Sequence, residues 1–73
     1  MKIKPLGANQ TEVSVGNKKI FVSYQTPVAA FVNGKAYRSA KKWSQTTSRH
    51  INQWLDGIDA EEKEQEFFDS LLK

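Results

Sequence analysis

Two short turn signals constrain the fold of this chain more than any other feature. Gly16-Asn17 and Asn33-Gly34 each stand between runs that are rich in β-branched and aromatic residues. Such pairs tolerate the left-handed backbone of a two-residue turn, so they favour tight β-hairpins. The sequence therefore predicts two consecutive hairpins that form an antiparallel meander of about four strands over residues 11–43. Residues 1–10 have no clear period, and we interpret them as a lead-in.

The last strand of this meander is predicted from Lys35–Ser39, with Lys41–Trp43 as an extension after a bend. After that point the hydrophobic period changes. Apolar residues now follow at i, i+3, i+4 and i+7, which is the spacing of one helix face; they are Ile51, Trp54, Leu55 and Ile58. The pattern predicts a helix over residues 45–56. Ser44 or Thr46 is the expected N-cap, and Gly57 is expected to end the helix.

A second helix is predicted over residues 60–72. Asp59 resembles an N-cap, and Glu62 stands three residues later, as in a capping box. The expected apolar side consists of Ala60, Phe67, Phe68, Leu71 and Leu72. Strands followed by helices indicate one α+β domain over residues 1–73, with both helices packed on one face of the sheet.

The chain is short, and this limits its core. Its 73 residues contain no cysteine and one histidine, so neither a disulfide nor a structural zinc site is expected. Because small domains bury little apolar area, a homodimer is one expected way to enlarge the core. We expect no cofactor.

Charge is distributed unevenly along the chain. Residues 1–50 hold nine Lys and Arg against one acid, Glu12, which is a charge of +8. Residues 51–73 hold two Lys against seven Asp and Glu, which is −5 and completes the net charge of +3. The basic part could meet a polyanion, and the acidic part a basic protein.

Residues 44–50 gather hydroxyl side chains before His50. A nucleophile would need a base within reach and a third group to orient that base, and no such motif is present. The hydroxyls are better interpreted as caps for the free N–H groups at a helix start. We therefore predict no catalytic residue and no enzyme.

The favoured function is the binding of an anionic partner, either a nucleic acid or a nucleotide-type ligand. A helix start attracts anions, Arg, Asn and Gln can read base edges, and aromatic rings can stack on bases. The predicted ligand-binding residues are Lys35, Tyr37, Arg38, Lys41, Lys42, Thr46, Arg49, His50, Asn52 and Gln53. The alternative is an inhibitor or adaptor that binds a host or defence protein through a strand edge or through Glu62, Glu66 and Asp69.

At SQTTSRHINQWL, with TPVAAFVNGKAYRSAKKW before it, the chain resembles a family of small bacteriophage proteins with no established activity. The resemblance covers about residues 20–58 and lies in the order of parts: Thr26–Ala29, a tight turn, a Tyr-bearing strand, and then Thr46–Leu55. It implies a phage or phage-derived accessory protein that acts by binding to host proteins, nucleic acid or defence components.

The first ten residues lack the apolar run of a signal peptide, and no window has the length of a membrane span. A soluble protein in the cytoplasm of the bacterial host, without membrane contact, is therefore expected.

Overall fold

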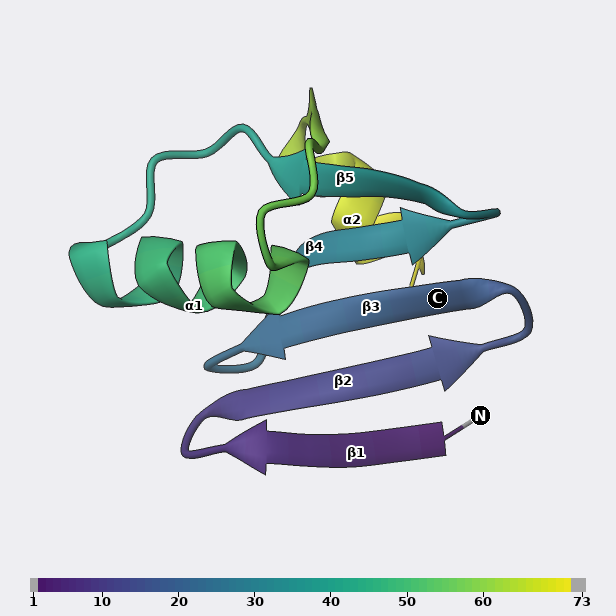
Figure 1. The fold of residues 1–73 in the computed structure, drawn as a ribbon, viewed down its shortest axis with the longest axis horizontal. Coiled ribbons are helices and arrows are strands. Elements are labelled where there is room, and N and C mark those ends of the chain that lie inside the picture. The colour runs from purple at the N-terminus through teal and green to yellow at the C-terminus, as the bar shows by residue number, and fades with distance from the viewer. Residues whose placement is uncertain (1, 72–73) are drawn as a thin grey trace.

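The structure is a computed structural model that describes residues 2–71 (Figure 1). Its strands are β1 (Lys2–Gly7), β2 (Gln10–Val15), β3 (Lys18–Ser23), β4 (Thr26–Val32), β5 (Lys35–Ser39) and β6 (Glu61–Lys63). Its helices are α1 (Gln45–Leu55) and α2 (Gln65–Leu71). The α+β class is therefore confirmed. No helix within residues 2–71 is long and apolar enough to cross a membrane.

All six strands form one sheet in chain order, β1 to β6. The first five are antiparallel and joined by two-residue turns, and β6 runs parallel to β5. Both predicted hairpin turns are confirmed, with Gly16 at φ 58° and Gly34 at φ 82°. The two turns also touch, because the Asn17 side chain donates a hydrogen bond to Asn33 Oδ1.

The predicted count of about four strands is too low. The expected lead-in contains β1, which pairs with β2 from Lys2↔Ser14 to Gly7↔Gln10. This strand is exposed along its whole length. Without a buried face it has no apolar alternation for sequence reasoning to detect. The expected extension at Lys41–Trp43 is also wrong, since β5 ends at Ser39 and a loop follows.

The first helix is confirmed. It begins at Gln45, as predicted, and ends at Leu55, one residue before the predicted end. Ser44 is the N-cap, and its Oγ accepts a hydrogen bond from the backbone N–H of Thr47 at 3.2 Å. Asp56 takes a left-handed conformation at the C-cap, and Gly57 follows at φ 79°. Ile51 and Leu55 are buried as predicted. Ile58 is not part of the buried stripe, because it lies beyond the helix end and is 51% exposed.

The second helix is shorter than predicted, and Asp59 does not cap it. Residues 61–63 instead form β6, in the register Tyr37↔Glu61, Arg38↔Glu62 and Ser39↔Lys63. The unpaired N–H and C=O groups on the outer edge of β5 offer this segment hydrogen bonds that outweigh its helical propensity. Helix α2 then begins at Gln65 and buries Phe68. Leu72, which was expected on its apolar side, lies outside the described residues.

The two helices cover opposite faces of the sheet, so the prediction that they share one face is wrong. Helix α1 packs through Ile51 and Leu55 on Phe21 and Ala29. Helix α2 packs through Phe68 on Ile20 and Ala30. Successive residues of β3 and β4 are apolar on both sides, so each face needs a cover. We call these the α1 face and the α2 face; in Figure 1, α1 lies in front of the sheet and α2 lies behind β4 and β5.

Candidate anion-binding pocket

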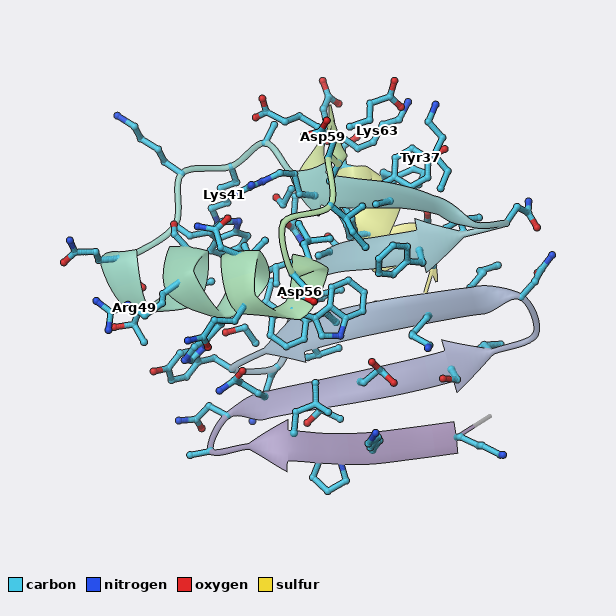
Figure 2. The ribbon with its side chains drawn as sticks, in the orientation of Figure 1. Tyr37, Lys41, Arg49, Asp56, Asp59 and Lys63 are labelled. Atoms are coloured by element: carbon cyan, nitrogen blue, oxygen red, sulfur yellow. The ribbon has the colours of Figure 1, made fainter. Side chains whose placement is uncertain are left out.

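A pocket of about 630 Å³ opens on the α1 face, beside the helix. Its walls come from the end of β5, the loop that follows it, one side of α1 and the segment that leads into β6. The lining residues are Arg38, Ser39, Ala40, Lys41, Lys42, Trp43, Ser48, Ile58, Asp59, Ala60 and Glu62. Figure 2 shows Lys41 and Asp59 on the two segments that lie above α1 in this view.

Two hydrogen bonds hold the backbone that follows β5. Ala40 N–H donates to the carbonyl oxygen of Lys63 at 2.8 Å. Lys41 N–H donates to Ser39 Oγ at 3.3 Å. These bonds position the start of the loop that carries Lys41 and Lys42, whose side chains are exposed.

Arg38 reaches the pocket from β5 and is oriented by α1. Its Nη1 donates to Asn52 Oδ1 at 3.2 Å, which joins the sheet to the polar side of the helix. One amide acceptor leaves most donors of the guanidinium fork available, because the group carries five N–H bonds. Arg38 is therefore arranged to offer hydrogen bonds to an anion.

Trp43 belongs to this loop, and its partly buried side chain packs against the core of the α1 face. The Nζ of Lys41 stands 5.0 Å from the centre of its ring, within the range of a cation–π contact. The indole Nε1 is buried and has no hydrogen-bond acceptor among the described residues. A buried donor without an acceptor is uncommon in folded proteins and calls for an explanation.

Two carboxylates share the pocket with the three cations. Asp59 lies on the segment before β6, and Glu62 is the register neighbour of Arg38 on β6. Both are exposed. Within residues 2–71, neither forms an ion pair with a lysine or arginine. The ion pairs of this part of the chain are those of Glu61 with Lys35 and with Lys63. The pocket therefore offers separate positive and negative groups.

The structure brings only part of the predicted ligand-binding set together. Arg38, Lys41, Lys42 and Asn52 lie at or beside the pocket. Lys35 and Tyr37 lie on the α2 face instead. There, Lys35 Nζ is 3.8 Å from a Glu61 carboxylate oxygen, and the Tyr37 ring packs 5.1 Å from the ring of Phe67.

The remaining predicted residues do not line the pocket. Thr46 and Arg49 are exposed near its start, and Figure 2 shows Arg49 on the lower side of the helix, away from Lys41. The ring of His50 stacks on Tyr24, with 6.4 Å between the ring centres. Gln53 lines a different pocket with Trp54.

The hydroxyl cluster serves the helix start, as the sequence predicts. Ser44 Oγ accepts from Thr47 N–H and stands 3.3 Å from Thr47 Oγ1. His50 Nδ1 is buried, and no described residue hydrogen-bonds to it. Within residues 2–71, no three His, Cys, Asp or Glu side chains are grouped as metal ligands.

The three acids proposed for a protein partner do not form one surface. Glu62 lines the pocket on the α1 face, whereas Glu66 and Asp69 are exposed on α2. Asp69 Oδ1 also accepts a hydrogen bond from Gln65 Nε2 at 3.2 Å.

Sequence reasoning did not assign Trp43, Ser48 and Asp59 to a binding site. Trp43 was expected in the extension of the last strand, and Asp59 as a helix cap. Trp43 and Ser48 reach the pocket because the loop and α1 pack on this face of the sheet, and Asp59 reaches it because β6 pairs with β5. No local pattern signals that pairing.

Comparisons with known proteins place the chain in a family but identify no characterised relative. Searches of curated proteins and of solved structures found no significant match. A family model described as a family of unknown function, DUF8033, matches residues 1–70, which include every residue of the pocket. The chain therefore belongs to the DUF8033 family of unknown function.

Proposed function

We propose that this protein binds an anionic partner of nucleic-acid or nucleotide type through the pocket formed by Arg38, Lys41 and Lys42. The observation that carries the proposal is the position of the acidic helix. Glu66 and Asp69 lie on α2, across the sheet from the pocket. An anion that approaches the α1 face therefore does not meet them directly.

Further lysines support binding on this face. Lys4 is the register neighbour of Glu12, whose carboxylate accepts a hydrogen bond from Trp54 Nε1 at 3.0 Å, so this row of the sheet faces α1. Lys19 lines a pocket with the same tryptophan. Cations thus lie on both sides of α1. A bound nucleic-acid strand could contact the lysines on one side and the cations of the pocket on the other.

The balance of charge within the pocket is modest, with three cations against Asp59 and Glu62. We expect binding to be strongly dependent on salt, because neutralised phosphates release counterions into solution. At low ionic strength the exposed lysines act over a longer distance, which makes this the most sensitive condition for detection.

The test is the fluorescence anisotropy of short labelled single-stranded RNA and DNA, measured from about 10 mM to about 150 mM salt. Wild-type protein should bind, and the affinity should fall as salt increases. The double variant Lys41→Ala/Lys42→Ala should lower the affinity at low salt by about tenfold, through the loss of two phosphate contacts.

The matched control is Lys18→Ala/Lys35→Ala. It removes the same charge, and Lys35 lies on the α2 face beside Tyr37. This control should bind nearly as well as the wild type. Equal losses in both variants would mean that net charge alone drives binding, and an absence of binding at low salt would refute the proposed function.

A host or defence protein is the second candidate partner. It is favoured by the exposure of Glu66 and Asp69, which stand three residues apart on α2 and so share one side of the helix. The resemblance to bacteriophage proteins suggests a bacterial lysate as the source of the partner. A captured protein that is lost on Glu66→Lys, but retained by Lys41→Ala/Lys42→Ala, would support this candidate over the first.

A further inference from the structure

We infer that the pocket on the α1 face recognises a single ribonucleotide, with its phosphate held by the cations and its ribose hydroxyls held by Asp59 and Glu62. This inference rests on the anion-binding function proposed above. It goes further because it assigns a role to the two acids, which the binding of a simple polyanion would leave unexplained.

The mixed charge of the pocket is the first reason. The phosphodiester groups of a polyanion carry acceptor oxygens and no donors, so they would be repelled by the exposed carboxylates of Asp59 and Glu62. A ribonucleotide carries both kinds of group. Its phosphate suits Arg38 and the lysines, and its hydroxyls can donate to carboxylates, which are acceptors only when ionised.

The availability of these groups is the second reason. Arg38 is oriented by Asn52, an uncharged acceptor, rather than by one of the acids. Among the described residues, Asp59 and Glu62 form no ion pair or side-chain hydrogen bond, although Glu62 stands next to Arg38 in register. The positive and negative groups of the pocket are therefore not neutralising one another, and a ligand can use both.

Trp43 supplies an independent indication of a ligand. Its indole N–H is buried without an acceptor among the described residues, in a side chain that lines the pocket. This nitrogen has almost no access to solvent, so a bound phosphate oxygen could accept from it only after the indole turns toward the pocket. The ring is also in contact with Lys41, so a ligand that engages Lys41 would change the surroundings of the indole.

The size of the pocket agrees with one nucleotide. Its volume of about 630 Å³ lies within the range of about 300–1,000 Å³ that is usual for small-molecule sites. A hydroxyl at the ribose 2′ position is the group that distinguishes RNA from DNA. Ribose selectivity is therefore the measurable property that follows from the two carboxylates.

The experiment is isothermal titration calorimetry at low salt with three probes: adenosine 5′-monophosphate, its 2′-deoxy counterpart and inorganic phosphate. The ribonucleotide should bind about tenfold more tightly than the deoxynucleotide, which corresponds to one charge-assisted hydrogen bond. The variant Asp59→Asn/Glu62→Gln should reduce this ratio while strengthening the binding of inorganic phosphate, because it removes two repelling charges.

The matched control is Glu66→Gln/Asp69→Asn, which removes the same charge from α2 and should leave the ribose ratio unchanged. A second readout is tryptophan fluorescence. The ribonucleotide should change the emission of the wild type, and Trp43→Phe should remove that change and weaken binding, since phenylalanine keeps a ring but lacks the N–H. Circular dichroism of each variant verifies that it is folded.

The outcomes separate this inference from the proposed function. Equal binding of the ribo- and deoxynucleotide, both weakened by Lys41→Ala/Lys42→Ala, would overturn ribose recognition and leave anion binding in place. An unchanged ratio in Asp59→Asn/Glu62→Gln would also overturn it. If neither nucleotide nor phosphate binds, and the labelled oligonucleotides do not bind either, both the inference and the proposed function fail.

Discussion

At the scale of single residues, the structure assigns separate roles to side chains that are adjacent in sequence. Ser44 ends the loop and caps α1, while Trp43 beside it lines the pocket. Asn52 orients Arg38, whereas its neighbour Gln53 faces another pocket on the far side of the helix. A helix turns by about 100° per residue, so neighbouring side chains meet different surroundings.

The cap at Ser44 gives a prediction for stability. Ser44→Ala removes the oxygen that accepts from Thr47 N–H at 3.2 Å. The free energy of unfolding of this variant, measured by urea denaturation, should be about 1 kcal/mol lower than that of the wild type. Thr46→Ala, at an exposed position of the first turn, is the control and should change stability much less. A loss as large in the control would refute a specific cap at Ser44.

At the scale of elements, Gln65 joins α2 to the sheet. Its Nε2 donates to the carbonyl oxygen of Pro27 on β4 at 2.7 Å, and its Oε1 accepts from Ser39 Oγ on β5 at 2.8 Å. Ser39 is 5% exposed, so its hydroxyl has little access to water. These two bonds anchor the first residue of α2 to the sheet shortly after β6 ends.

Gln65→Ala should therefore destabilise the fold more than its partial exposure suggests. The change removes the acceptor of the Ser39 hydroxyl proton and the side-chain donor to the Pro27 carbonyl, at a cost of about 2 kcal/mol. Chemical denaturation should show this loss. Gln45→Ala makes the same substitution at an exposed position at the start of α1, and its stability should stay close to that of the wild type. Equal stability of the two variants would contradict the role of Gln65.

At the scale of the whole molecule, the sheet separates two charged surfaces. The molecule measures 30 × 25 × 22 Å along its principal axes. The electrostatic screening length is about 30 Å at 10 mM salt and about 8 Å at 150 mM. Charges on the α2 face therefore influence the pocket across the protein only when salt is low.

This comparison predicts a salt-dependent effect of Glu66→Gln/Asp69→Asn on oligonucleotide affinity. At about 10 mM salt the variant should bind about twofold more tightly than wild type, because a distant repulsion is removed. At about 150 mM salt the two proteins should bind equally. Anisotropy titrations at both concentrations provide the measurement, and an enhancement that persists at the higher concentration would place these acids close to the bound strand.

The sequence predicted the elements whose signals are local. The turns at Gly16-Asn17 and Asn33-Gly34 and the helix capped by Ser44 depend on residues within a few positions of one another. The ligand-binding cations predicted from the sequence were Lys35, Arg38, Lys41, Lys42 and Arg49; the structure gathers Arg38, Lys41 and Lys42 at the pocket but not Lys35 or Arg49. Strand β1 was missed, since an exposed edge strand needs no apolar pattern.

Tertiary structure decided the features that depend on distant contacts. Residues 61–63 have a helical pattern and a cap signal, but the open edge of β5 supplies backbone hydrogen bonds that make them a strand. This pairing brings Asp59 and Glu62 beside the cations of the pocket. It also precedes α2, whose Phe68 reaches the face opposite α1 because the apolar residues of β3 and β4 alternate to both sides. The sequence by itself determined the local turns, the first helix and the order of charges. The folded sheet determined which charges face each other, because only long-range strand pairing and burial bring those segments together.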